Sequence, residues 1–277
     1  MLYKILCLMN HLLSFSNLEI RKRKAFPGYY LQHFPLPNFP CCNGVYTVSI
    51  DKIISPHGFS SSKGGWHYYS EFLKQYEAQP DVSYEGTVLK KYYDVFQPQS
   101  VADILFFDDK NAAPNILQKM HPLLIRDFWR LDGSLEEITA HIIEEETQLF
   151  GSISDIYGEE QFIRCINAYR LVKKHGYLPD RFEDGYLCGY FLINGDDYRF
   201  LAMAGKHRLA AFSVLDIHDI KVTVPYNLKV LDIKDIDKWP TVQSGLFTKE
   251  QIECVFHRFF EEDGTGFAVQ YDLEVKL

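Results

Sequence analysis

One stretch of this chain constrains its fold more than any other. It is an apolar run, followed by one glycine and then by a helix whose first turn is cationic. Residues 199–215 read Arg-Phe-Leu-Ala-Met-Ala-Gly-Lys-His-Arg-Leu-Ala-Ala-Phe-Ser-Val-Leu. The apolar run before Gly205 predicts a strand, and the spacing of apolar residues after it predicts a helix with a buried face. Gly205 permits the sharp turn that such a junction needs. The junction therefore places Lys206, His207 and Arg208 in the first turn of a helix.

Three potential cations at a helix start favour an anionic ligand. The free N–H groups and the dipole of a helix start attract negative charge. Arg208 offers a planar fork of donors, Lys206 offers a point charge, and His207 can donate from one or both ring nitrogens. We therefore predict a phosphate-binding turn over residues 205–208. An ordinary surface turn is the alternative, because short motifs of this kind often occur by chance.

The elements around this turn follow a definite order. Gly176 suits a helix C-cap, and Asn194-Gly195 is a hairpin signal between two apolar runs. The predicted elements, in chain order, are helix 162–175, strand 186–193, strand 198–204, a helix from residue 206 and strand 219–224.

This order, together with Gly205, His207 and Arg208, resembles the ParB/sulfiredoxin-like fold over about residues 158–230. Members of that family bind nucleotide phosphates at a Gly-x-x-Arg or Gly-Cys-His-Arg turn, so the resemblance implies a nucleotide site here. Sulfiredoxins need a cysteine where this chain has Lys206, so sulfinic acid reduction is not expected. The resemblance instead implies phosphoryl transfer, the activity of the free-serine kinases of this family. The family also has a glycine after the phosphate-binding helix, where this chain has Asp216, so we expect that helix to end differently.

The charge balance opposes a nucleic-acid partner. The 277 residues include 29 Lys and Arg against 37 Asp and Glu, which gives a net charge of −8. A negative protein repels the backbone of DNA or RNA, although a local basic groove is compatible with these totals. The segment after residue 230 also lacks the pattern of a helix-turn-helix, so the DNA-binding role of the chromosome-partition members is not expected.

Cysteine usage and the amino-terminal segment bear on location. The six cysteines include neither a Cys-x-x-Cys motif nor a Cys/His pair at zinc spacing. We therefore expect reduced thiols, a cytoplasmic location and no metal-ligating set. Within residues 1–24, an apolar stretch over residues 1–15 is interrupted by Lys4, Asn10 and His11, and the basic cluster Arg21-Lys22-Arg23-Lys24 follows it. This stretch is too short to span a bilayer, and a packed helix followed by solvated charges is favoured over contact with a membrane surface.

We predict an α+β fold, and the remaining patterns divide the chain into two regions. Residues 1–150 are expected to form a largely helical, loop-rich region of unknown fold. Residues 151–277 are expected to form a small mixed-sheet module with a closing helix and strand. The further predicted elements are helices 66–77, 87–96, 134–150 and 248–260, and a terminal strand over 267–275.

A polar segment rich in serine and glycine separates the first elements. Residues 55–67 read Ser-Pro-His-Gly-Phe-Ser-Ser-Ser-Lys-Gly-Gly-Trp-His. Long loops are often functional, so this one could cover a ligand, with Lys63 or His67 reaching in. A bare surface loop is slightly favoured.

Phosphoryl transfer needs positive charge on the phosphates, usually Mg²⁺, and a carboxylate that orients or deprotonates the attacking hydroxyl. Asp180, Glu183 and Asp184 are the nearest candidate carboxylates, although acids in turns are often only structural. Asp180 and His207 are the candidate catalytic residues. We predict a phosphotransferase that uses ATP or another nucleotide with Mg²⁺ on a small hydroxyl compound, an amino acid or a sugar. The alternatives are a non-catalytic, nucleotide-responsive regulator or scaffold and, more weakly, a nucleic-acid-processing protein.

Overall fold

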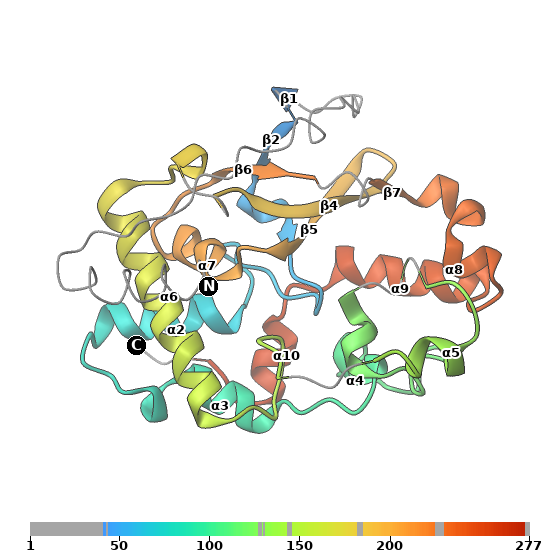
Figure 1. The fold of residues 1–277 in the computed structure, drawn as a ribbon, viewed down its shortest axis with the longest axis horizontal. Coiled ribbons are helices and arrows are strands. Elements are labelled where there is room, and N and C mark those ends of the chain that lie inside the picture. The colour runs from blue at the N-terminus through green and yellow to red at the C-terminus, as the bar shows by residue number, and fades with distance from the viewer. Residues whose placement is uncertain are drawn as a thin grey trace, which may run out of the picture.

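A mixed sheet runs along one side of the molecule and helices fill the other side (Figure 1). The computed structural model describes residues 41–42, 44–126, 129, 131–142, 146–181, 185–224 and 230–274. The expectations for residues 1–24, and the candidate carboxylates Glu183 and Asp184, lie outside these described residues. Among the described helices, none combines the length and apolar character needed to cross a bilayer. The α+β class is confirmed.

The described strands form one sheet in the order β1-β2-β6-β4-β5-β3, and β7 pairs with β4 beside this path. The strands are β1 (Cys41–Cys42), β2 (Val45–Ser49), β3 (Ile53–Ile54), β4 (Leu187–Asn194), β5 (Asp197–Ala204), β6 (Asp219–Thr223) and β7 (Val230–Asp232). The expected hairpin is present, because β4 and β5 are antiparallel and Asn194 lies opposite Asp197. β2 pairs with β6 and β3 pairs with β5, so the sheet takes strands from both sides of residue 150.

Most predicted helices are present close to their expected bounds. The helices are α2 (Tyr68–Ala78), α3 (Val88–Val95), α4 (Val101–Leu105), α5 (Leu135–Thr139), α6 (Asp155–His175), α7 (Lys206–Val214), α8 (Pro240–Gln243), α9 (Lys249–Glu261) and α10 (Thr265–Gln270). Short 3-10 helices connect them: η3 (Ile50–Lys52), η4 (Tyr84–Gly86), η5 (Pro122–Arg126), η7 (Pro179–Arg181) and η8 (Ile233–Lys238). The capping signals explain the agreement: Gly176 ends α6, and Thr248 forms a capping box with Gln251 at the start of α9.

Helix α7 is the element around which the rest is packed. It lies beneath the sheet, and it contacts β4 as well as α2 and α6 (Figure 1). Its residues Leu209, Ala210, Ala211 and Phe212 are buried, because neighbours surround it on several sides. After α7, Asp216 adopts a left-handed φ of 56°. Glycine adopts this conformation without strain, and Asp tolerates it better than most other residues.

The predicted closing strand is wrong, because residues 265–270 form helix α10. The sequence alternates over 267–275, but Phe267 and Tyr271 are also four residues apart and therefore share one helical face. Their rings contact each other at 4.6 Å between centroids. Asp263 accepts hydrogen bonds from the backbone N–H and the hydroxyl of Thr265, which favours a helix start at this point.

The helix predicted over residues 134–150 is much shorter than expected. The capping box between Ser134 and Glu137 is present, but α5 ends at Thr139. Downstream, Leu149 and Phe150 are buried against the core, and the carbonyl of Leu149 accepts a hydrogen bond from the hydroxyl of Tyr92. These tertiary contacts hold residues 149–150 on a path that does not continue α5, so tertiary packing overrides the local pattern.

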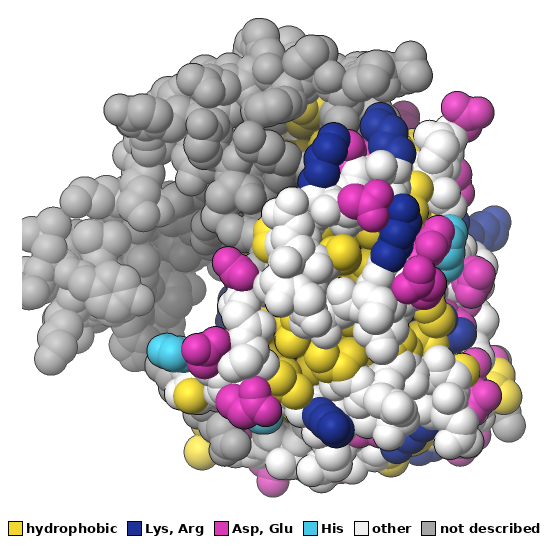
Figure 2. Space-filling model, turned by 90° about the vertical axis from the view of Figure 1, so that its right-hand side faces the viewer, with side chains coloured by type: hydrophobic (Ala, Val, Ile, Leu, Met, Phe, Trp, Pro, Cys, Tyr) yellow, Lys and Arg dark blue, Asp and Glu magenta, His cyan; other side chains and the backbone are white. Residues whose placement is uncertain are grey.

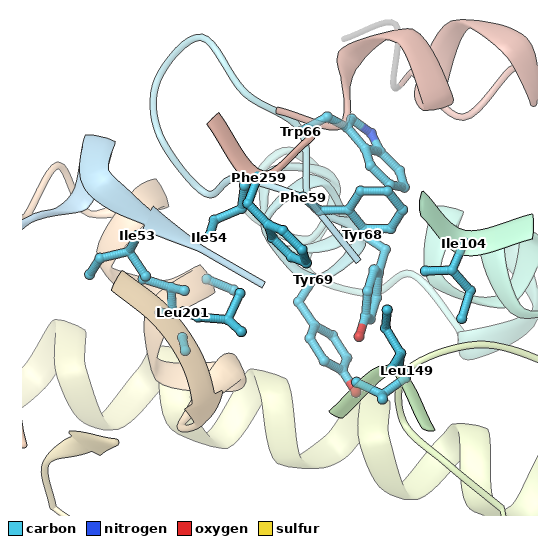
Figure 3. Packing of buried hydrophobic residues seen from close by; sticks show 14 of the residues in the cluster. Ile53, Ile54, Phe59, Trp66, Tyr68, Tyr69, Ile104, Leu149, Leu201 and Phe259 are labelled. Atoms are coloured by element: carbon cyan, nitrogen blue, oxygen red, sulfur yellow. The ribbon is translucent and has the colours of Figure 1, made fainter. Parts of the chain in front are cut away.

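The bare surface loop favoured for residues 55–67 is also wrong. Phe59, Trp66 and Tyr68 pack together in the interior (Figure 3). The backbone N–H groups of Ser60 and Trp66 both donate to the carbonyl of Asp263, at 3.0 and 2.9 Å. The ring of Phe59 lies 4.7 Å from that of Phe267, between centroids. The segment is therefore part of the core, although Lys63 at its tip is exposed.

A substitution at Gly205 tests how tightly the turn between β5 and α7 packs against Leu187 of β4. Gly205 has a φ of 91°, and an added Cβ would lie 2.7 Å from Cδ1 of Leu187. Gly205→Ala should therefore lower the free energy of unfolding by about 1–2 kcal/mol of left-handed strain and by about 1–3 kcal/mol of overpacking. Gly195→Ala is the matched control, because Gly195 has a φ of 60° and open space around it. Urea denaturation should show a clearly larger loss for Gly205→Ala, and equal losses would contradict the tight packing.

Candidate functional site

The three cationic side chains after Gly205 do not converge on one point. Successive helical residues point about 100° apart, so neighbours in sequence face different surroundings. Lys206 turns into the interior and is 4% exposed. The His207 ring packs on that of Tyr69, with centroids 4.5 Å apart. Arg208 turns toward the start of β4, where its guanidinium donates to the carbonyl groups of Gly185 and, at 3.5 Å, Tyr186.

Asp180 lies on the Arg208 side of the turn, away from Lys206. It is exposed in η7, and its carboxylate accepts a hydrogen bond from the hydroxyl of Tyr186. The pKa of Tyr177 reflects the same arrangement: burial raises it, Arg208 lowers it and Asp180 raises it. The predicted site residues therefore fall into two groups, Asp180 with Arg208 and Lys206 with His207.

Lys206 is buried among basic groups. Burial and the nearby charge of Arg126 lower its pKa from 10.5 to about 7. Burial, Lys206 and His207 lower the pKa of His67 to about 3. Burial also lowers the pKa of His57, with further lowering by Lys206, His67 and Arg126. Each positive charge therefore makes the others harder to form, and within the described part of the chain no carboxylate is among the groups that shift these three pKa values.

His207 belongs to the same group of bases. Burial and the nearby charges of Arg164, Lys206 and Arg208 together lower its pKa to about 3. Its Nε2 is buried and has no hydrogen-bond partner among the described residues. A neutral imidazole at this position can donate from one ring nitrogen and accept at the other.

Several more buried nitrogens in this region lack a hydrogen-bond partner. Among the described residues, the Nε2 atoms of His57, His67 and Gln161 are buried without one. A backbone hydrogen bond with Leu149 acts in the opposite direction on His57 and raises its pKa. Buried polar atoms in folded proteins are nearly always satisfied, so a group of exceptions needs an explanation.

Tyr69 connects these nitrogens into one cluster. Its ring lies 5.8 Å from that of His67 and 4.5 Å from that of His207, between centroids. Its hydroxyl lies 3.1 Å from the hydroxyl of Tyr93 and 3.4 Å from Oε1 of Gln161. We define the buried basic cluster as five side chains that contact Tyr69 or whose pKa is coupled to Lys206: His57, His67, Gln161, Lys206 and His207. Tyr69 itself packs beside Tyr68, with the two rings 4.5 Å apart between centroids (Figure 3).

The cluster has the properties of an anion site. It lies at the amino end of α7, where the helix dipole favours negative charge. The described residues contain no group of three His, Cys, Asp or Glu side chains that could hold a metal ion, so the three histidines are not arranged as such a set.

Sequence reasoning found part of this cluster. Lys206 and His207 follow from the strand–glycine–helix pattern, and His67 was considered as a residue that could reach a ligand. His57 and Gln161 were missed. His57 lies in a Ser/Gly-rich segment that gives no sign of burial, and Gln161 is one polar residue on a long helix. No pattern in the sequence separates them from solvated side chains.

Comparison with known proteins gives no match: no family model, no curated protein and no solved structure is similar to this chain at a significant level.

The distribution of charge on the surface bears on nucleic-acid binding. On the face shown in Figure 2, basic and acidic side chains are interspersed, with hydrophobic side chains between them. This face does not present the extended basic surface that binds a nucleic-acid backbone.

Lys206 predicts an unusual dependence of stability on pH. The unfolded chain keeps this proton up to about pH 10.5, whereas the folded protein releases it near pH 7. The unfolded state binds more protons between these values, so the free energy of unfolding should rise with pH by up to about 1.4 kcal/mol per unit. Lys206→Met should remove this rise and be more stable than the wild type at pH 7.

Urea denaturation between pH 7 and 9 measures this effect. Lys63→Met is the matched control, because Lys63 is exposed and should leave the pH dependence unchanged. The same slope in Lys206→Met and in the wild type would contradict a buried, uncompensated lysine.

Proposed function

We propose that this chain binds the phosphate groups of a nucleotide at the amino end of α7 and transfers one of them to a small hydroxyl compound. The carrying observation is the burial of Lys206 among bases, with no carboxylate among the described groups that shift its pKa. A buried charge without a partner costs several kcal/mol, and a phosphate supplies the missing partner. Phosphate also suits the helix start, where free N–H groups accept an anion.

A nucleotide suits this turn better than an isolated phosphate. Lys206 faces the interior and the half-buried His207 packs its ring on Tyr69, whereas Arg208 faces the other side of the same helical turn. A di- or triphosphate carries several phosphoryl groups, so it can contact both sides when Arg208 leaves the carbonyl groups that it now binds. The resemblance of residues 158–230 to a nucleotide-binding fold supports the same ligand.

The transfer step would use Asp180 as the carboxylate. The hydroxyl oxygen of the acceptor attacks the terminal phosphorus, and the bond from that phosphorus to the bridging oxygen breaks. The proton of the hydroxyl goes to Asp180, and the nucleoside diphosphate leaves with the negative charge. Mg²⁺ would be held mainly through the phosphate oxygens, which is the usual mode for this ion. An amino acid or a sugar is the proposed acceptor.

Non-catalytic nucleotide binding is the second candidate. It is favoured by the position of Asp180, which is exposed and bonded to Tyr186 rather than placed beside Lys206. In that case the ligand would stabilise one arrangement of the helices and thereby regulate a partner.

A cytoplasmic location accompanies both candidates. Cys165, Cys188 and Cys254 are unpaired, as expected for a chain kept in a reducing compartment. Nucleotides and small metabolites are present in the same compartment.

Calorimetric titration with ATP, ADP and CTP, each with and without Mg²⁺, tests nucleotide binding. At least one of them should bind, and Lys206→Met should weaken it about 10- to 100-fold, because a charge-assisted bond contributes roughly 1.5–3 kcal/mol. Lys63→Met should bind like the wild type. The proposal is refuted when none of the nucleotides binds the wild-type protein.

A turnover assay separates the two candidates. The wild type, mixed with the nucleotide that binds and a panel of amino acids and sugars, should release nucleoside diphosphate only with the correct acceptor. Asp180→Asn should lower the rate at least about 100-fold while nucleotide affinity is kept, since it removes the acceptor of the proton. Asp196→Asn, an exposed acid at the hairpin tip, is the control. Binding without turnover across the panel would favour the regulatory candidate.

A further inference from the structure

We propose that two copies of this chain associate through the outer face of α6, with the two helices antiparallel about a two-fold axis beside Ile163. We define the outer face of α6 as seven exposed side chains spaced three or four residues apart, which therefore share one side of the helix: Ile156, Glu160, Ile163, Asn167, Arg170, Leu171 and Lys174. The inference goes beyond the proposed function and does not depend on it, because it concerns this face and not the start of α7.

Exposed apolar side chains are concentrated on this face. Ile156, Ile163 and Leu171 are 74%, 54% and 47% exposed, and they are three of the five large hydrophobic side chains exposed in the described part of the chain. The other two, Val95 and Val269, lie singly on α3 and α10. Single exposed hydrophobic residues are ordinary, whereas several along one face indicate a surface that a partner covers.

A cavity of about 270 Å³ hollows the surface beside Ile163, between α6 and the end of α2. Phe162, Ile163 and Ile166 line it from α6, and Tyr76 and Val82 line it from the opposite side. Asn167 and Arg170 also line this cavity, so it belongs to the outer face of α6. A side chain that protrudes from a partner can enter such a recess, as buried anchors do in stable interfaces.

The charges along α6 indicate that this partner is a second copy. Glu159 and Glu160 lie in its first half, and Arg170 and Lys174 lie in its second half. Arg170 donates to the neutral hydroxyl of Tyr76, and within the described part of the chain Glu159, Glu160 and Lys174 form no ion pair. An antiparallel second copy places each acidic half against a basic half, and the two-fold axis repeats this contact.

The dipole of α6 does not account for the same features. Early acids and late bases complement a helix dipole, but the effect is confined to the first and last turns. Glu159, Glu160 and Arg170 lie outside those turns. The dipole also gives no reason for exposed isoleucine and leucine side chains.

The length of α6 permits all these contacts at once. Its 21 residues span about 31 Å, and Figure 1 shows the helix lying across α2 and α3 on the viewer's side. An axis beside Ile163 brings this residue next to Ile163 of the second copy. Ile156 then lies level with Leu171 of the second copy, and Glu160 lies within one helical turn of Arg170 of the second copy.

Sedimentation equilibrium of the full chain over a dilution series tests the apolar contact. The wild type should be dimeric at the higher concentrations and dissociate on dilution. Ile163→Glu should weaken the dimer at least about 100-fold, because the two-fold axis buries two unpaired carboxylates. Val269→Glu is the matched control, because Val269 is equally exposed but lies on α10, and it should dimerise like the wild type. The melting temperature of dilute protein should be similar in all three.

Charge reversal tests the antiparallel arrangement. Glu159→Lys with Glu160→Lys makes the outer face of α6 basic throughout, and Arg170→Glu with Lys174→Glu makes it acidic throughout. Each double variant alone should dimerise at least about tenfold more weakly than the wild type, because like charges then face each other. An equal mixture of the two should form a heterodimer at least as readily as the wild type forms its homodimer.

The results that would overturn the inference are specific. A wild type that stays monomeric throughout the dilution series would overturn it, as would a dimer that Ile163→Glu leaves unchanged. A mixture of the two charge-reversed variants that associates no better than either variant alone would overturn the antiparallel arrangement. Nucleotide affinity should be the same in Ile163→Glu and in the wild type, so failure of the proposed function would leave this inference standing.

Discussion

The burial of Lys206 is the physical constraint on which the site depends. β5 ends in a left-handed residue at Gly205, and α7 starts directly beneath the sheet, between β4 and the helices α2 and α6. A helix in this position has little solvent-facing surface, so its first residue points into the interior whatever its chemistry. The fold thus buries an amine where an uncharged side chain such as methionine would make the protein more stable. Keeping a charge at this position lowers the free energy of unfolding.

The neighbours of Lys206 increase that cost rather than reduce it. Arg126 lowers the pKa of Lys206, and Lys206 and His207 lower the pKa of His67. Proteins that bury a lysine for stability alone surround it with carboxylates or backbone carbonyl groups. An arrangement that disfavours protonation in the free protein becomes favourable when an anion enters, because the amine and the anion then stabilise each other.

The helices and strands around Gly205 were predicted well from the sequence, whereas the way in which distant segments pack together was predicted less well. The strand, the glycine and the helix of residues 199–215 carry strong local signals, as do the caps at Gly176 and Thr248. The paths of residues 55–67 and 265–270 depend on contacts between segments 200 residues apart, such as Phe59 with Phe267, which no local pattern encodes. The convergence of Lys206, His207 and Arg208 was expected from their adjacency, but helical geometry turns adjacent side chains apart.

The same geometry determines which elements surround the start of α7. Residues 206 and 208 point to different sides of this helix. The helices α2 and α6 pack against its buried side, and α2 comes from the amino-terminal half of the chain. Residues 55–67 bring His67 to that side, and Asp263 at the end of the chain holds them there through two backbone hydrogen bonds. An anion bound in the cluster would therefore connect three helices from both halves of the chain, so ligand binding and the packing of the whole fold would stabilise each other.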